Sequence, residues 1–242
     1  MRRRITLFIL LGILIGLTVW ITNLDMLKFR PPATYGELFK RISEHIKMVG
    51  LAELIAIIVG VPLGILVSRP KFRKISPLMM GMVNVGQTVP SMAMVAIVAV
   101  IIGDFGFVPA VIALSIYGLL PIVRNSFAGI KNIDPPIIEA AKGMGMSKKQ
   151  IIWKIEIPLA RRIIMAGIRT STVVNVGTAT LAALIAAGGL GMIILAGLYN
   201  NIPLLLLQGA APTAALAMIL DAILGGIEEW ATPRGLKIKR GA

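Results

Sequence analysis

The chain has 242 residues, of which 57% are hydrophobic and 15% charged, with a net charge of +14 and a mean hydropathy of +0.87. These values exclude an ordinary soluble domain and predict an all-α membrane protein surrounded by lipid. Because the positive charge lies mostly beside apolar segments, we expect no nucleic-acid partner. With no cysteine and one histidine, His45, the chain is expected to form no disulfide, metal site or Cys/His catalytic pair.

The first predicted span covers residues 5–24, since about 20 apolar residues cross a hydrocarbon core of about 30 Å. No small-x-small cleavage site follows it, so we interpret it as an uncleaved helix with a cytoplasmic N-terminus rather than a signal peptide. Residues 25–47 are polar and predict an external loop with a short amphipathic helix from about Tyr35. In that loop we expect His45 to be solvated.

The second predicted span, residues 48–68, returns to a basic cytoplasmic cluster at residues 69–74 and carries one acidic side chain, Glu53. A charge in mid-span costs about 2.5–3.5 kcal/mol on insertion scales, so this carboxylate should avoid lipid. Two interpretations stay open: it reaches the outer interface, or it belongs to a transport pathway.

The third predicted span, residues 77–102, is interrupted by the sequence NVGQTVPS at residues 84–91. Pro90 removes a backbone donor, so the freed carbonyl groups must meet protein or water. Broken, polar backbone at membrane depth is typical of transport pathways. The alternative is a Pro-kinked helix packed by glycines, in which Gln87 and Thr88 bond to neighbouring helices.

The remaining predicted spans are residues 107–123, which end at Arg124, residues 163–187 and residues 203–224. The hydroxyl and small side chains of the 163–187 segment favour helix packing, with Asn175 as the best candidate for a pathway residue. GGLG at residues 188–191 predicts a turn near the outer surface. The last span carries Asp221.

The six predicted spans place both termini in the cytoplasm, and the distribution of positive charge agrees with this orientation. Five of its 25 lysines and arginines fall in segments assigned to the outer face, and the other 20 fall inside or at inner helix ends. We divide the chain into residues 1–47, an N-terminal helix and external loop; residues 48–230, a transmembrane core with a cytoplasmic loop at 125–162; and residues 231–242, a basic cytoplasmic tail.

Residues 133–162 of that loop predict two short helices joined at a bend. Asp134 before Pro135 is typical of a helix start, in which the carboxylate accepts a backbone hydrogen bond. Gly143 and Gly145 should loosen the first helix, and Ser147 with Gln150 predicts a capping box at the start of the second. Pro158 is expected to end or kink the second helix. This shape suits the docking of another protein.

No phosphate-binding loop, HExxH metal motif or GxSxG nucleophile motif occurs in the sequence. We therefore expect no catalytic residue and no bound cofactor in this chain. If it moves a solute actively, another subunit should hydrolyse the nucleotide.

The loop resembles the EAA motif of membrane subunits of bacterial ABC importers, in which EAA is followed at fixed spacing by Gly and by I-x-L-P. Ile157 stands where the family usually has leucine. The residues that carry the resemblance, and that it assigns to contact with the ATPase, are Glu139, Ala140, Ala141, Gly145, Ile155 and Pro158.

Further stretches resemble the osmoprotectant branch of that family, the permeases for glycine betaine, carnitine and choline: QTVPSMA, YGLLPIVRNSFAGI, MAGIRTSTVVNVGTATLAALIAAGGLG and the PRG of the tail. The resemblance spans about residues 49–234. It implies a type I importer fold in a bacterial or archaeal cytoplasmic membrane.

The implied partners are a second permease subunit, identical or homologous, cytoplasmic ATPase subunits that use ATP and Mg²⁺, and an extracytoplasmic solute-binding protein. Our candidates for a weak polar solute path are Asn84, Gln87, Thr88, Ser91 and Asn175. The alternatives are an importer subunit for another small solute, such as an amino acid or sulfonate, and an ion-coupled secondary carrier.

Overall fold

The computed structural model describes residues 12–13, 15–16, 19 and 35–231. Within 35–231 the regular elements are all helical, and they follow one another as α2 (Tyr35–Val67), η2 (Pro70–Phe72), α3 (Ser76–Gly86), α4 (Ser91–Ile102), α5 (Phe107–Lys131), α6 (Pro135–Gly143), α7 (Lys148–Ile151), the π-helical η3 (Ile152–Glu156), α8 (Ile157–Thr178), η4 (Leu181–Ile185), α9 (Gly191–Tyr199) and α10 (Pro203–Ala231).

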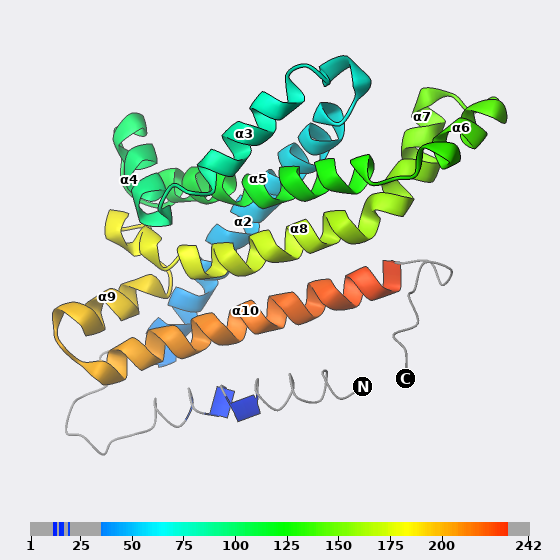
Figure 1. The fold of residues 1–242 in the computed structure, drawn as a ribbon. Helices are drawn as coiled ribbons and strands as arrows, with labels where there is room; N and C mark the ends of the chain where they lie inside the picture. The colour runs from blue at the N-terminus through cyan, green and yellow to red at the C-terminus, as the bar shows by residue number, and fades with distance from the viewer. Residues whose placement is uncertain (1–11, 14, 17–18, 20–34, 232–242) are drawn as a thin grey trace.

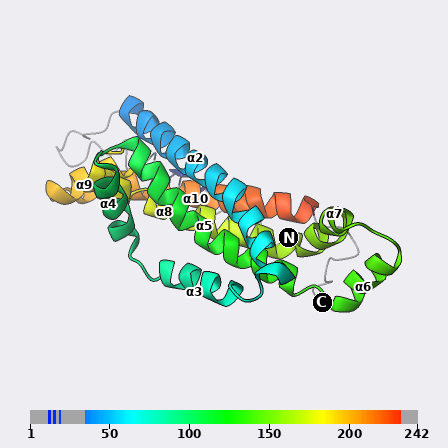
Figure 2. The same ribbon diagram turned by 90° about the horizontal axis from the view of Figure 1, so that it is seen from above.

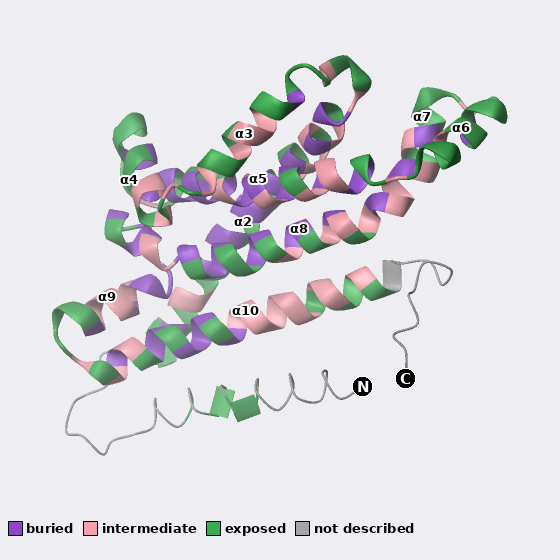
Figure 3. Cartoon of the chain, viewed as in Figure 1, coloured by how far each residue is buried: buried purple, intermediate pink, exposed green. Residues whose placement is uncertain are grey.

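Helices α2, α5 and α8 form the centre of the bundle (Figure 1). α5 and α8 run side by side, α2 crosses both, and α10 packs along α8 and α9. Seen from above, α3 and α4 lie on the side of α5 that faces away from α2, and α6 and α7 project from one end of the bundle (Figure 2). Buried residues concentrate where the central helices meet, around Met48, Leu114 and Val176 (Figure 3).

Two glycines one helical turn apart let α2 approach α5 closely. A Cβ at Gly60 would lie 2.9 Å from Ile122 Cγ2, and one at Gly64 would lie 2.5 Å from Ser126 Cβ and 2.7 Å from the Val123 carbonyl oxygen. Small residues at this spacing allow helix backbones in membranes to pack in van der Waals contact. The close crossing of α2 and α5 therefore requires residues without a side chain at positions 60 and 64.

The expected external loop at 25–47 is wrong for its second half. A helix does begin at Tyr35, but it continues without a break to Val67. Ion pairs on its exposed side, from Arg41 to Glu37 at 3.3 Å and to Glu44 at 3.1 Å, explain the polar composition that suggested a loop. Residues 20–34 lie outside the described residues.

His45 is buried, so the prediction of a solvated histidine is also wrong. Its Nε2 lies 3.0 Å from the Val176 carbonyl oxygen of α8. Next to it, Glu44 Oε2 accepts a hydrogen bond from the Gly189 amide at 2.9 Å. Gly188 and Gly189 have φ of 86° and 77°, which confirms the predicted GGLG turn and shows that the start of α2 holds it in place.

The interruption at residues 84–91 separates two helices rather than bending one slightly. α3 and α4 meet at 102°, and Pro90 is the N-cap residue of α4. Thr88 Oγ1 donates a hydrogen bond to the Val85 carbonyl at 2.7 Å and so caps the end of α3 locally. The angle far exceeds an ordinary proline kink, so the broken form of this span is confirmed.

Three described helices are long and apolar enough to cross a membrane: α2, α5 and residues 203–229 of α10; the bent pair α3 and α4 can make a fourth span. The first predicted span falls almost wholly outside the described residues, as does the tail after 231. The six-span arrangement and the location of both termini stay predictions.

The contacts agree with the predicted division between inner and outer segments. Arg69, in the basic segment after α2, lies 2.6 Å from Glu156 at the base of the 133–162 loop. At the opposite end of α2, Glu44 and His45 contact the predicted outer turn. Segments assigned to the same face of the membrane therefore meet at the same end of the bundle.

An ion-pair network fastens α10 to α8. Arg169 Nη2 lies 2.8 and 2.9 Å from the two carboxylate oxygens of Asp221, and its Nη1 lies 3.0 Å from Glu228. Arg162 contacts Glu228 less closely, at 3.7 Å, and is half exposed.

We expect Arg169→Met to destabilise the protein by about 1–2 kcal/mol, because two acidic groups lose a half-buried partner. For a chain of this size the loss corresponds to a thermal midpoint about 2–8 °C lower. Thermal unfolding in detergent would measure it, with Arg162→Met as the matched control. Equal midpoints for the two variants would contradict a structural role for Arg169.

Candidate coupling loop and solute pocket

The first loop helix begins where the sequence predicted, but without the predicted side-chain cap. Asp134 is the N-cap residue of α6 and Pro135 occupies its first turn. The Asp134 carboxylate makes no side-chain capping hydrogen bond, so that detail of the prediction is wrong. The backbone angles of Asp134, φ −59° and ψ 127°, together with the fixed φ of proline, are sufficient to start the helix.

Gly145 ends α6 in a Schellman motif. Its φ is 78°, its amide bonds to the Lys142 carbonyl at 2.9 Å, and the Met146 amide bonds to the Ala141 carbonyl at 3.1 Å. This pattern satisfies the last carbonyl groups of the helix and requires a left-handed residue, for which glycine carries no Cβ penalty. Gly143, in contrast, remains helical. The glycine of the EAA motif thus sets the bend between the loop helices.

The capping box at Ser147 is confirmed. Ser147 Oγ accepts from the Gln150 amide at 3.3 Å, and Gln150 Oε1 accepts from the Ser147 amide at 2.8 Å. Of the two outcomes predicted at Pro158, an end or a kink of the second helix, the end is wrong. The chain stays helical through a π turn, in which the Ile157 amide bonds to the Ile152 carbonyl, and Pro158 lies in the first turn of α8. The wider π turn accommodates the proline ring without ending the helix.

Most residues of α6 and α7 are exposed, and the two helices lie at the end of the bundle (Figure 3). Ala141 is buried and anchors α6, whereas Glu139 and Ala140 are exposed. Met144 is 72% exposed and Trp153 is 71% exposed. A short projecting helix with one buried contact and exposed apolar side chains suits a surface that another protein covers.

An ion pair joins the base of this loop to the segment that follows α2. Arg69 Nη1 lies 2.6 Å from Glu156 Oε2, an ion pair whose angles are not those of a hydrogen bond. Arg69 Nε also donates a hydrogen bond to the Ile65 carbonyl of α2 at 3.2 Å. Glu156 is buried inside the π turn. Movement of the loop can therefore reach the bundle both through α8 and through α2. Sequence reasoning missed this pair, whose partners stand far apart in the chain.

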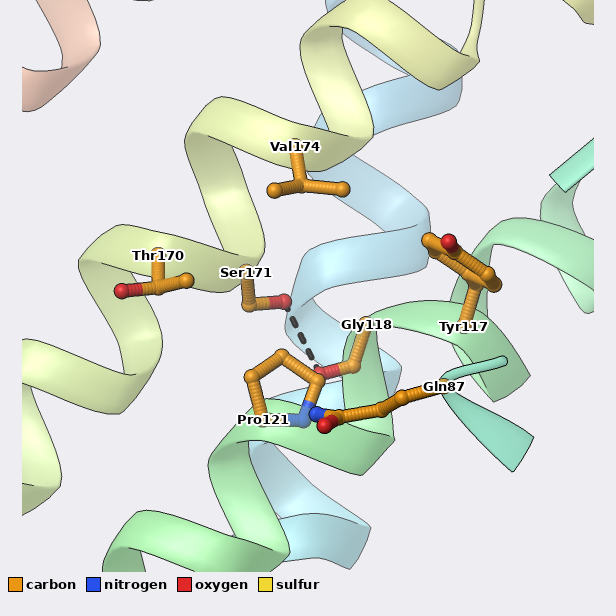
Figure 4. A pocket seen from close by; sticks show the side chains of 7 residues that line it. All are labelled: Gln87, Tyr117, Gly118, Pro121, Thr170, Ser171 and Val174. Carbon is orange, nitrogen blue, oxygen red and sulfur yellow. Dashed lines mark hydrogen bonds between the residues drawn. The ribbon is translucent and has the colours of Figure 1, made fainter. Parts of the chain in front are cut away.

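A pocket of about 210 Å³ lies between α3, α5 and α8, with Ser171 and Gly118 joined by a hydrogen bond in its wall (Figure 4). Its lining residues are Gln87, Tyr117, Gly118, Pro121, Thr170, Ser171 and Val174. The pocket combines an aromatic ring and apolar surface with a few polar groups, a composition that suits a small organic solute.

Glu53 lies behind the wall of this pocket. It is 7% exposed, and its Oε2 accepts hydrogen bonds at 2.9 Å from Ser171 Oγ and from Asn175 Nδ2. Within the part of the chain that the structure describes, Glu53 Oε1 and Asn175 Oδ1 have no hydrogen-bond partner. The interpretation that Glu53 reaches the outer interface is wrong, because α8 supplies polar partners for it inside the bundle.

The structure brings together two of the five candidate path residues. Gln87 lines the pocket, and Asn175 is buried behind it. Asn84 and Thr88 are exposed, Ser91 is half-buried, and none of these three lines the pocket. Tyr117 was missed; its place one turn before Pro121 on the same helix face was the available signal.

A comparison with known families shows the class of this membrane protein. A family profile described as "Binding-protein-dependent transport system inner membrane component" matches residues 60–233. The chain belongs to this family, and it is therefore an inner-membrane component of binding-protein-dependent transport. An ion-coupled secondary carrier does not fit this membership.

Curated relatives of this chain are osmoprotectant permeases. It is 44% identical to the glycine betaine/carnitine/choline transport system permease protein OpuCB of Bacillus subtilis, over 84% of this chain and 92% of the relative. It is 40% identical to the osmoprotectant import permease protein OsmY of Salmonella typhimurium, over 93% of each chain.

Among solved structures, the inward-facing MetNI methionine ABC transporter aligns with a TM-score of 0.71 and 21% identity, over 81% of this chain and 96% of the matched chain. At that identity the likeness shows the fold alone, that of a type I importer membrane subunit.

Proposed function

We propose that this chain is the membrane-spanning permease subunit of an ATP-driven importer for quaternary ammonium solutes such as glycine betaine, carnitine and choline. The observation that carries the proposal is the exposed 133–162 loop, with a defined bend and an ion pair to the segment that follows α2, in a chain more than 40% identical to such a permease. The names of the relatives favour these solutes over an amino acid or sulfonate.

Under this proposal the chain spans the membrane beside a second permease subunit, and separate cytoplasmic subunits hydrolyse ATP with Mg²⁺. An extracytoplasmic binding protein delivers the solute. The loop acts as the coupler: Glu139, Ala140 and the exposed side of α6 contact the ATPase, while Gly145 sets the angle of α6. To drive transport, the loop must bind two ATPase states with different free energies, because equal affinity would shift no equilibrium.

The pocket between α3, α5 and α8 is proposed as part of the solute path. Gln87 supplies a polar group in its wall, and Asn175 supports that wall through Glu53. Asn84, Thr88 and Ser91 flank the break between α3 and α4, and we propose that they meet the solute when the broken span moves.

Co-purification tests the docking assignment. When the ATPase and permease subunits are expressed together, the tagged wild-type permease should retain the ATPase in detergent. Glu139→Arg should lose most of it, because the exposed carboxylate on α6 changes sign. Asp104→Arg makes the same charge change in the turn between α4 and α5, away from the loop, and serves as the control. Full retention by Glu139→Arg would contradict docking through α6.

A further inference from the structure

The two sides of the pocket differ in charge, and the cationic side comes from α5. Tyr117, Pro121 and Arg124 follow one another at i, i+4 and i+7, so they share a face of that helix. Helical side chains tilt toward the N-terminus, which directs the long Arg124 side chain back toward the pocket. Arg124 Nη1 lies 3.4 Å from Oε1 of Gln87, which lines the pocket. A positive charge therefore stands at the Gln87 side.

The opposite wall has a buried acidic group behind it. Glu53 contacts the lining residue Ser171 directly and, within the described residues, forms hydrogen bonds to neutral groups but no ion pair. Arg169, beside the lining residue Thr170, is paired with acidic groups of α10 instead. A charged group in low dielectric is stabilised by an opposite charge nearby. A cation in the pocket would stand one side chain away from Glu53.

Tyr117 gives the same region an aromatic surface. Its ring lies on one side of the pocket, and Ser171 and Val174 of α8 lie on the other (Figure 4). A quaternary ammonium group has no N–H to donate, so it is bound by aromatic faces and by the field of nearby anions rather than by hydrogen bonds. A ring on one side and a buried acidic group behind the other wall meet both requirements.

We infer that this pocket binds a zwitterionic quaternary ammonium solute in one orientation, with the ammonium group between Tyr117 and the Ser171 wall and the carboxylate toward Gln87 and Arg124. The inference rests on the proposed function and adds to it a preference of the permease among these solutes. The permease itself favours solutes that carry a carboxylate, such as glycine betaine, over plain cations, such as choline. Arg124 discriminates between them, and Glu53 serves both.

The test is uptake by the complete importer in proteoliposomes, with ATP enclosed on the ATPase side and saturating binding protein. Labelled glycine betaine and labelled choline are compared for the wild type, Arg124→Gln and Glu53→Gln. Because every preparation contains the same binding protein, its own selectivity cancels when the ratio of the two rates in a variant is divided by the ratio in the wild type. Arg124→Gln should lower the glycine betaine to choline ratio at least fivefold, while Glu53→Gln should lower both rates and leave the ratio within twofold.

Lys131→Gln is the matched control, since it removes a positive charge from the cytoplasmic end of the same helix and should keep the wild-type ratio. The thermal midpoint of each complex separates a loss of recognition from a loss of folding. An unchanged ratio for Arg124→Gln overturns the inference, as does an unchanged uptake of both solutes by Glu53→Gln. If the wild-type importer moves neither solute, the proposed function itself fails, which is a different result from an unchanged ratio.

Discussion

Replacing Gly145 by valine should lower ATP-driven uptake of glycine betaine by the assembled importer about tenfold or more. The residue sits at φ 78°, where a left-handed conformation costs an L-residue about 1–2 kcal/mol and a β-branched side chain more. The Schellman motif would open, and α6 would lose its fixed angle to the second loop helix. Uptake and binding-protein-stimulated ATP hydrolysis, measured on the same proteoliposomes, would show both activities reduced together.

Two variants control for this result. Gly143→Val introduces the same side chain two residues earlier, where a Cβ meets no atom within 4 Å and φ is helical, and uptake should stay close to the wild type. Gly145→Asn should retain much of the activity, because asparagine tolerates the left-handed region. Wild-type uptake by Gly145→Val would show that the bend does not transmit force.

Gly64→Val should destabilise the packing of the central bundle. A Cβ there would stand 2.5 Å from Ser126 Cβ and 2.7 Å from the Val123 carbonyl oxygen, and valine adds two further methyl groups. Overpacking of this kind costs about 3 kcal/mol, enough to displace α5 from α2. The expected result is a thermal midpoint in detergent lowered by about 6–12 °C, with a reduced yield of monodisperse protein.

Gly50→Val is the control for this experiment, because it lies on the same helix at an exposed position where a Cβ meets nothing within 4 Å. Its stability should lie within about 1 kcal/mol of the wild type, a midpoint difference of at most about 4 °C, since valine has a higher helix propensity than glycine. Equal stability of Gly64→Val and Gly50→Val would contradict the close α2–α5 crossing.

The loop was the most predictable part of the molecule, because its signals are local. Asp134 and Pro135 start a helix within two residues, and the capping box of Ser147 and Gln150 closes within four. Gly145 was identified from its place in the EAA motif, but only the structure shows that it alone, and not Gly143, takes the left-handed conformation. Local hydrogen bonds of this kind are encoded in neighbouring residues and need no tertiary contact.

Buried polar residues were the least predictable part. His45 pairs with Val176, 131 positions away, and Glu53 pairs with Asn175, 122 positions away. The sequence suggested a solvated loop for His45 and left Glu53 open between the outer interface and a transport pathway, because charged and polar side chains are usually exposed unless a partner is present. The partner comes from the packing of α2 against α8, which no local pattern specifies.

Pro158 illustrates a third limit, where a correct local rule left open whether the helix ends or kinks, and the structure shows that it does not end. Proline does lack the amide that an α-helix needs, and the chain compensates by widening one turn into a π segment before α8. That adjustment coincides with the buried Glu156 and its ion pair to Arg69. A tertiary contact and a backbone irregularity support each other at the base of the coupling loop.

The most direct test of the account is uptake of labelled glycine betaine into proteoliposomes that contain this permease, its ATPase and its binding protein. We predict uptake that requires ATP on the ATPase side, requires the binding protein on the other side, and is lost when any one of the three components is omitted. Uptake by this chain alone, driven by an ion gradient without ATP, would contradict the account.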